Sequence, residues 1–349
     1  MARASDGSVK IAQYISAFLN VYVPSQRTRS SHTLRAYHCA LSLYVGFLET
    51  QKGVRSEALC GECFNAEYIE DWLLWIMEHR GCSPQTCNNR LASLRVFLKF
   101  LGKKDVSFMH LSHAASQIPR KKHIRKKVKG MSKNAVQSLL SAPDLSTKTG
   151  RRDLALMIAI YSTAARLDEV LSLRIKHLHL VAAKPCITVV GKGDKIRTLY
   201  LLPKVVAHME KYVKEFHGTH PEPDALVFYS RNSGLFGKMS QTAVSSRLAI
   251  HAATANAVCN EVSLDLHAHQ LRHAKASHWL EDGMNIVQIS FLLGHEHLNT
   301  TMIYLDITNE QELKALATLD DENDKVVSKK WKCHTSSLAD FCGVRTMSV

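Results

Sequence analysis

Long apolar segments are absent from this sequence of 349 residues. No hydrophobic run approaches the roughly 20 residues that a helix needs to cross a bilayer. The first residues, MARASDGSVKIAQYISAFLNVYV, also lack the uninterrupted apolar segment of a signal peptide. We therefore expect no membrane contact and a cytoplasmic location, where the nine cysteines remain free thiols.

Acidic residues are scarce relative to basic ones. The chain has 31 Asp and Glu against 45 Lys and Arg, which gives a formal net charge of +14 at pH 7. Such an excess favours a polyanionic partner, and nucleic acid is the commonest. The length suits two domains, and a hydrophobic content of 46% argues against general disorder.

The sequence has no H-E-x-x-H pair, although histidines cluster towards its C-terminal end. His267 and His269 are two positions apart, so on a helix they point to different sides, and His295 and His297 have the same spacing. A zinc enzyme built from these histidines stays open as an alternative that the spacing does not favour. A second candidate zinc site consists of four cysteines: Cys60, Cys63, Cys82 and Cys87.

Apolar residues recur at helical spacing over the first hundred residues, and no strand pattern interrupts them. Asn65 and Ser83 suit the starts of helices, whereas Gly81 and Gly102 suit their ends. The predicted helices of this four-helix unit cover residues 8–22, 31–50, 65–80 and 83–102.

A strongly basic segment follows. Eight of the fourteen residues from 120 to 133 are Lys or Arg, with no acid among them. A block of like charge repels itself and does not pack, which predicts either a solvated connector or an arm. Its place between two folded segments favours an arm that lies along a phosphate backbone. The residues expected to contact DNA are Arg120, Lys121, Lys122, Arg125, Lys126, Lys127 and Lys129.

The pattern changes from about residue 132. Helical periodicity in NAVQSLLSAP and RRDLALMIAIYSTAA precedes two strand-like runs at residues 186–190 and 196–201. The glycines in the GKGDK segment between them predict a β-hairpin. Helices are expected up to about residue 318, and the polar tail after it carries no predicted structure.

Several polar residues in this half suit an anion better than a metal. His269 and Arg272 share one helix face, and an arginine offers a planar fork of donors that matches phosphate oxygens. Arg166 begins a short helix, Glu169 is placed to orient it, and Lys192 lies in the glycine turn. The chain order of the candidate residues is Arg166, Lys192, His269, Arg272, His295 and Tyr304.

This order resembles the active site of the tyrosine recombinases, the phage-integrase family. The segment HQLRHAKASHWLEDGMNIVQISFLLGHEHLNTTMIYLDI is similar to the most diagnostic part of that family. ARLDEVLSLR resembles its first arginine box, and VVGKGDKIRTLYL resembles its lysine hairpin. The resemblance spans about residues 8–318, with one departure at Ala165, where the family commonly has glycine.

The resemblance implies a mostly α fold with a small β-hairpin or sheet in the catalytic domain (α+β), arranged as a two-domain DNA clamp. The N-terminal unit is similar to a SAM-like core-binding domain. The expected divisions are a core-binding domain at 1–118, a basic linker at 119–130, a catalytic domain at 131–319 and a C-terminal tail at 320–349.

The implied activity is site-specific recombination of DNA. Tyr304 would attack a scissile phosphate to give a 3′-phosphotyrosyl link and a free 5′-hydroxyl, with His269 as its acid/base partner. Lys192 would protonate the departing oxygen. The resemblance implies no metal and no other cofactor.

The remaining site residues would support this reaction. Arg166 and Arg272 would clamp the non-bridging oxygens, and His295 would donate a further hydrogen bond. Glu169 and His273 would support these groups without contacting the phosphate themselves.

The implied partners are double-stranded DNA and further copies of the chain. A monomer or dimer would assemble into a homotetramer in a synaptic complex on paired sites, and NEQELKALATL resembles the terminal helix that docks onto a neighbour. An accessory recombinase or DNA-bending protein is a further partner class, and the bacterial nucleoid is the implied location. Integration or excision of a mobile element and resolution of DNA remain open, as do a type IB topoisomerase-like relaxer and a catalytically inactive DNA-binding protein.

Overall fold

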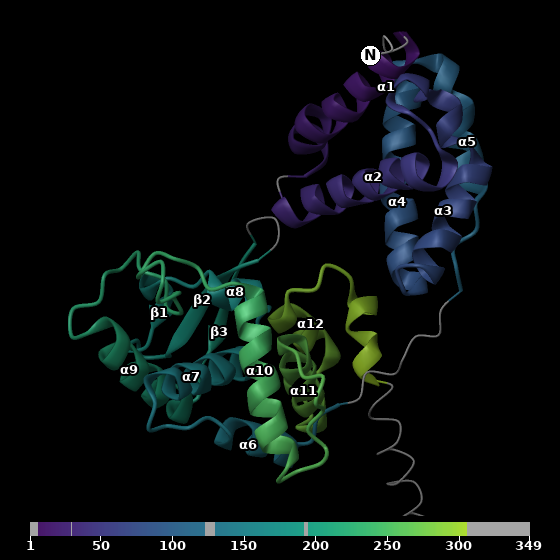
Figure 1. The fold of residues 1–349 in the computed structure, drawn as a ribbon. Helices are drawn as coiled ribbons and strands as arrows, with labels where there is room; N and C mark the ends of the chain where they lie inside the picture. Colours follow the sequence, from purple (N-terminus) through teal and green to yellow (C-terminus); the bar gives the residue numbers. More distant parts are fainter. Residues whose placement is uncertain (1–5, 29, 123–129, 192–194, 306–349) are drawn as a thin grey trace, which may run out of the picture. The chain divides into compact units, whose positions relative to one another are not determined.

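The computed structural model describes residues 6–28, 30–122, 130–191 and 195–305 (Figure 1). It divides into two compact units, Met1–Lys126 and Lys127–Val349, so the division falls within the basic segment. Each unit has its own hydrophobic core. No helix in the described parts of the chain is long and apolar enough to cross a membrane.

The N-terminal unit is entirely helical over its described residues. Its core is rich in aromatic side chains, with Phe18, Tyr44, Phe64, Trp72 and Phe97 fully buried. Its helices and helical turns are α1 (Asp6–Ala17), η1 (Phe18–Arg27), α2 (Ser31–Lys52), η2 (Ser56–Ala58), η3 (Gly61–Phe64), α3 (Ala66–Glu78), α4 (Pro84–Lys104), η4 (Val106–Phe108) and α5 (Met109–Gln117).

The starts of α3 and α4 follow the predicted capping residues. The side chain of Asn65 accepts a hydrogen bond from the amide of Tyr68 at 2.8 Å, and Ser83 accepts one from Thr86 at 3.3 Å. The predicted end of α4 at Gly102 is wrong, because the helix continues to Lys104. Gly102 instead allows close packing on α5, since a Cβ there would lie 3.2 Å from Cα of Met109.

The C-terminal unit combines helices with one small sheet. Helix α7 packs against both α9 and α11, and α11 contacts α12. Its elements are α6 (Lys133–Ser141), α7 (Lys148–Thr163), α8 (Leu167–Leu171), η5 (Ile175–His177), β1 (Leu178–His179), β2 (Cys186–Val190), β3 (Ile196–Tyr200), α9 (Pro203–His217), α10 (Gln241–Asn256), α11 (Ala268–Glu281), α12 (Ile286–Leu293), η6 (Leu298–Thr300) and η7 (Met302–Tyr304).

The sheet has three antiparallel strands in the order β1-β2-β3. Val190 pairs with Ile196, so the chain reverses between them as the glycine-rich segment predicts. The predicted hairpin and the mostly helical α+β class are therefore confirmed. The two-residue strand β1 was not predicted, because it is too short to show an alternating pattern.

Candidate active site

The end of helix α12 gathers three arginines from three different elements. Nε of Arg197, on β3, donates to the carbonyl of Leu292 at 3.0 Å. Nη2 of Arg272, on α11, donates to the carbonyl of Leu293 at 2.7 Å. Nη2 of Arg166, at the start of α8, donates to the carbonyl of Gly294 at 3.3 Å. The last carbonyls of a helix lack partners within it and carry partial negative charge, so they attract cations. The helix end therefore holds three guanidinium groups close together.

Gly294 makes this close approach possible. It ends α12 in the left-handed conformation, with φ of 64°, which glycine adopts without steric cost. A Cβ at this position would also lie 2.9 Å from Nη1 of Arg197. Glycine is thus required for two reasons, and His295 follows directly after it.

The carboxylate of Glu169 lies among the arginines. Glu169 is 8% exposed and accepts hydrogen bonds from Nη2 of Arg197 at 2.6 Å and Nη1 of Arg166 at 3.0 Å. It also accepts one from the backbone amide of Arg166 at 2.7 Å. Burial by itself raises the pKa of Glu169, but the hydrogen bonds and charges of the two arginines outweigh burial and hold the pKa below its ordinary value. Three guanidinium groups against one carboxylate leave an excess of positive charge.

Replacing Glu169 with glutamine should lower the free energy of unfolding by roughly 1.5–3 kcal/mol at neutral pH, because the buried guanidinium of Arg197 loses its charged acceptor. The half-exposed guanidinium of Arg166 loses the same acceptor but is partly solvated. The difference in the free energy of unfolding between wild type and the variant should have its largest value at pH values above the ordinary glutamate pKa. It should shrink as the pH falls through the lower folded-state pKa of Glu169, since both proteins then carry a neutral side chain. Urea denaturation across this pH range measures the effect.

The matched control is Glu215→Gln, which removes the charge from a carboxylate paired with Arg151 at 2.8 Å where both side chains are 25–31% exposed. A smaller loss is expected there, because exposed pairs are screened by solvent. Equal losses in the two variants would contradict a special role for the buried network.

Arg272 is the most deeply buried of the three arginines, at 1% exposure. Besides its bond to α12, its Nη1 donates to the carbonyl of Ala164 at 2.6 Å, and its Nη2 lies 3.1 Å from Nε2 of His295. Burial, and then the charge of Arg166, lower the pKa of Arg272 to about 10. The guanidinium therefore stays charged at neutral pH.

The turn before Arg166 has an unusual backbone at Ala164, not at Ala165. Ala164 adopts the left-handed conformation with φ of 49°, the one non-glycine residue with positive φ in the described parts of the chain. Its carbonyl is the one that accepts from Arg272. The alanine at 165 is therefore compatible with the position of the first arginine.

His295 is held from both sides of its ring. Nε2 faces Nη2 of Arg272, and Nδ1 lies 2.8 Å from Oγ1 of Thr301, which is fully buried. Burial, and then the charge of Arg272, lower the pKa of His295 to about 4, so the ring is neutral at pH 7. Because an arginine can only donate, Nε2 accepts and Nδ1 carries the proton in this arrangement.

Tyr304 contacts helix α11 at His273, the residue that follows Arg272. Its hydroxyl is 2.7 Å from Nδ1 of His273, and the residue is 1% exposed. Burial, opposed in part by Arg272, raises the pKa of Tyr304 to about 12. The contact is therefore with His273, which the sequence analysis treated only as support. His269, the expected partner, lies beside His273 with ring centroids 4.3 Å apart.

A surface cleft of about 570 Å³ opens beside the arginines. Arg166, Arg197 and His295 line it, whereas Arg272 and Tyr304 are buried and are not among its lining residues. Lys195, at the end of the hairpin, spans the cleft to Glu296 at 3.1 Å. A polyanion entering here would meet mainly positive charge.

Some predicted residues lie elsewhere or outside the described ranges. Gly191 abuts the network, because a Cβ there would lie 3.1 Å from Nη1 of Arg197. Arg120, Lys121 and Lys122 line a groove beside α4, where Asn88 exchanges two hydrogen bonds with the backbone of Lys121 at 2.8 and 2.9 Å. The predicted residues outside the described ranges are Lys192, Arg125, Lys126, Lys127 and Lys129, and the predicted docking helix near 309–319 lies outside them too.

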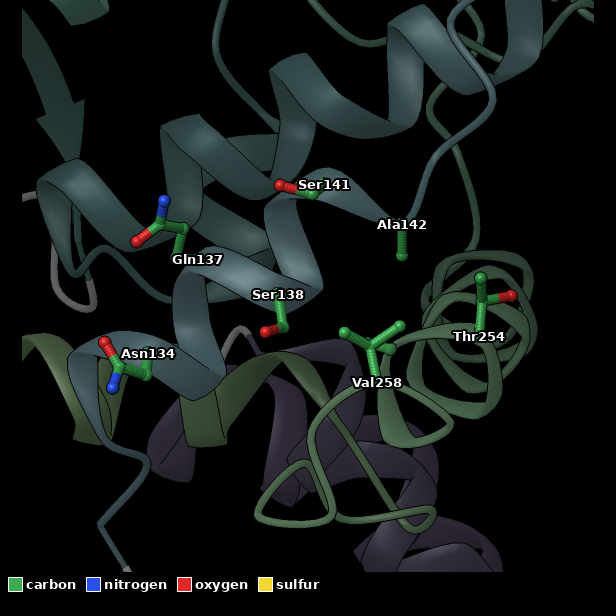
Figure 2. Close-up of a pocket in the computed structure, with 8 residues that line it drawn as sticks. Asn134, Gln137, Ser138, Ser141, Ala142, Thr254 and Val258 are labelled. Atoms are coloured by element: carbon green, nitrogen blue, oxygen red, sulfur yellow. The ribbon is translucent and has the colours of Figure 1, made fainter.

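A second pocket, of about 410 Å³, lies between α6 and the end of α10 (Figure 2). Figure 2 shows the short polar side chains of Asn134, Gln137 and Ser138 on one side and Thr254 and Val258 on the other. None of the predicted site residues lines this pocket.

The described residues contain no group of three or more His, Cys, Asp or Glu side chains placed to hold a metal ion. Among the cysteines of the alternative zinc site, the Sγ atoms of Cys60 and Cys63 are 3.8 Å apart, and Cys87 is buried within α4. The arrangement around α12 is built from guanidinium and imidazole donors, and donors of this kind bind phosphate oxygens.

Comparison with known proteins agrees with this arrangement. Residues 129–311, more than half of the chain, match the model of the phage integrase family, and residues 15–104 match the phage integrase N-terminal SAM-like domain. The tyrosine recombinase XerC of Chlamydia caviae is 27% identical over 311 residues, which cover 84% of this chain and 93% of that protein.

Two solved structures share the fold. XerH site-specific recombinase bound to difH substrate, a pre-cleavage complex, aligns with a TM-score of 0.62 at 17% identity over 87% of this chain and 94% of that one. A lambda integrase tetramer bound to a Holliday junction aligns with a TM-score of 0.59 at 13% identity over 84% and 76%. Because the phage integrase family model alone matches more than half of the chain, the chain belongs to the phage integrase family of tyrosine recombinases.

Proposed function

We propose that the chain is a site-specific DNA recombinase that cuts and rejoins strands through a 3′-phosphotyrosyl intermediate. The observation that carries the proposal is the group of three arginines at the end of α12, together with the contact of Tyr304 with His273, the residue that follows Arg272 on α11. Such a group offers a phosphodiester both an electrostatic clamp and a nucleophile.

The reaction begins with Tyr304. Its Oη attacks the scissile phosphorus, the bond from phosphorus to the 5′-oxygen breaks, and the strand remains linked through a 3′-phosphotyrosine. The tyrosyl proton passes to a histidine on α11, and Lys192 supplies a proton to the departing 5′-oxygen. Attack by a 5′-hydroxyl on the same phosphorus reverses the steps and rejoins a strand. No cofactor is consumed, because the phosphodiester energy is conserved in the covalent link.

The arginines stabilise the charge that develops on phosphorus. Arg166 and Arg272 bind the non-bridging oxygens, and His295 adds a hydrogen bond. Arg197 does not take part in this contact, since its guanidinium is used by Glu169 and the end of α12. It fixes the position of Glu169 and, through it, that of Arg166.

The buried position of Tyr304 implies one rearrangement before cleavage. Its hydroxyl contacts His273, the residue is 1% exposed, and burial raises its pKa to about 12, so the hydroxyl is protonated and shielded from solvent. Binding of the scissile phosphate has to draw the ring out of this position for in-line attack. Removal of the proton to His269 or His273 accompanies that step.

The basic segment supplies sequence-independent affinity for duplex DNA. Asn88 on α4 holds the backbone of Lys121. Arg120, Lys121 and Lys122 line the groove there and present charge to a phosphate backbone. Binding is expected to weaken steeply with salt, because counterions are released. A tetramer on paired sites is the working assembly, in keeping with the tetrameric lambda integrase, and an accessory recombinase or DNA-bending protein is the further partner.

Covalent trapping tests the proposal. The protein is incubated with a pool of nicked duplexes and denatured in SDS, and protein-linked DNA is recovered. We expect an adduct whose DNA-linked peptide contains Tyr304 and whose sequences share one site. Adducts spread over unrelated sequences would favour a type IB topoisomerase-like relaxer. No adduct, with salt-sensitive DNA binding intact, would favour a non-catalytic DNA-binding protein.

A further inference from the structure

One threonine joins the phosphate-binding histidine to the segment that carries the nucleophile. Thr301 is 0% exposed, and its Oγ1 lies 2.8 Å from Nδ1 of His295. Its own amide donates to the carbonyl of Leu298 at 2.7 Å, and its carbonyl accepts from the amide of Tyr304 at 3.1 Å. The backbone of Thr301 is thus fixed, and its hydroxyl is aimed at the histidine.

The hydrogen bonds of His295 define its protonation in the free protein. Nη2 of Arg272 can only donate, so Nε2 of His295 accepts, and the proton of the neutral ring is on Nδ1. Nδ1 then donates to Oγ1 of Thr301. In this state the histidine has no proton to offer from Nε2.

Binding of a phosphate exchanges the donor and acceptor roles of the two ring nitrogens of His295. When Arg272 turns its donors to the phosphate, Nε2 of His295 has to donate to a phosphate oxygen, so the proton has to be on Nε2. Nδ1 then becomes an acceptor. A hydroxyl serves both states, because it accepts from Nδ1–H in the first and donates to Nδ1 in the second. A backbone carbonyl could only accept, and a carboxylate would favour the charged ring.

We propose that Thr301 is a positioning residue whose hydroxyl holds His295 in both tautomers, so that this histidine donates to the scissile phosphate from Nε2 once the phosphate displaces Arg272. This proposal rests on the proposed recombinase function. Thr301 acts through His295 and does not itself touch DNA.

The test compares Thr301→Val, which keeps the branched shape and removes the hydroxyl, with Thr301→Ser, which keeps the hydroxyl. Thr188→Val is the matched control, since it removes another threonine–histidine hydrogen bond, the 3.1 Å contact of Thr188 with His179 on the sheet. The rate of single-turnover adduct formation is measured on the duplex recovered by trapping, below the melting temperature of every variant.

Thr301→Val should form the adduct about ten-fold more slowly, because a buried Nδ1 is left without a partner. Thr301→Ser and Thr188→Val should stay within about three-fold of wild type. A Val variant as fast as wild type, or a Ser variant as slow as the Val variant, would overturn the proposal. The wild-type adduct reports separately on the proposed function, so the two ideas can fail independently.

The tautomers themselves can be observed by ¹⁵N NMR of histidine-labelled protein, with the signals of His295 assigned by their loss in His295→Asn. The free protein should show Nδ1 protonated. The Tyr304→Phe protein bound to the same duplex should show Nε2 protonated. The same tautomer in both states would reject the exchange, whatever the rates of the threonine variants.

Discussion

A Tyr304→Phe protein is expected to bind duplex DNA with the wild-type salt dependence and to form no covalent adduct with it. The phenyl ring keeps its place in the buried apolar cluster that includes Ala164, Ala276 and Leu293, and only the hydroxyl is lost. The fold should lose no more than one hydrogen bond, to His273, worth roughly 0.5–1.5 kcal/mol. Cleavage should fall below detection, because the phenolic oxygen that forms the phosphotyrosyl bond is removed. SDS-resistant adducts and fluorescence anisotropy with labelled duplex measure the two properties.

Tyr161, on α7, provides a matched control against the same helix α11. Its hydroxyl is 2.8 Å from Nδ1 of His278, also on α11, and burial raises the pKa of Tyr161 to about 12, as it does for Tyr304. Tyr161→Phe therefore removes an equivalent tyrosine–histidine bond and should retain adduct formation. Adducts that persist in Tyr304→Phe would assign the nucleophile to another residue.

Arg272→Lys should slow adduct formation about 100- to 1000-fold, the loss typical of removing a well-placed oxyanion donor. A lysine has one compact head group, so it cannot contact the carbonyls of Ala164 and Leu293 and His295 together. Burial already lowers the pKa of Arg272 to about 10, and an ammonium in the same place is moved towards its neutral form. Single-turnover rates of adduct formation, measured with protein in excess over DNA, report the slower chemical step separately from any change in DNA affinity.

Arg247→Lys is the matched control for this substitution. Nε of Arg247, on α10, donates at 2.7 Å to buried Asp153, so the change also removes an arginine–carboxylate contact from the same unit. Its adduct rate should remain close to that of wild type. A rate for Arg272→Lys within ten-fold of wild type, with both proteins folded, would show that the buried guanidinium does not stabilise the transition state.

Most of the fold could be predicted from the sequence, because its helices are long and amphipathic. The buried set Ile69, Trp72, Leu73 and Ile76 follows the predicted face of α3, for example. Helix α5 was missed, since its nine residues, MHLSHAASQ, carry little apolar periodicity. It depends on tertiary contacts instead, because Arg95 on α4 donates to the carbonyls of Ala115 and Ser116 in the last turn of α5.

The candidate site was predicted as a set of residue types in a fixed order, and the structure places Arg166, Arg272 and His295 together. The contacts among them were not predictable. The bond from Arg197 to α12 joins residues 95 positions apart, and nothing local indicates it. One signal was present, because Arg197 shares the buried face of β3 with Leu199 while Ile196 on the other face is exposed.

The roles assigned to single residues stay predictions until they are tested, and the place of Lys192 lies outside the described residues. The pairing of Tyr304 with His273 differs from the expected pairing with His269 for a simple reason. Positions 269 and 273 are one helical turn apart on the same face of α11, so the sequence places either imidazole near the hydroxyl. Only the packing of η7 selects between them.

The carboxylate shared by two arginines also limits how this chain can change over generations. Replacing Glu169 alone leaves the buried guanidinium of Arg197 and the half-exposed one of Arg166 without their shared carboxylate. Replacing Arg197 alone removes the guanidinium that pairs with Glu169 and packs against Gly294. A lineage can leave this arrangement only by passing through a poorly folded intermediate or by substituting both positions together. Positions 169 and 197 should accordingly vary as a pair among descendants of this sequence.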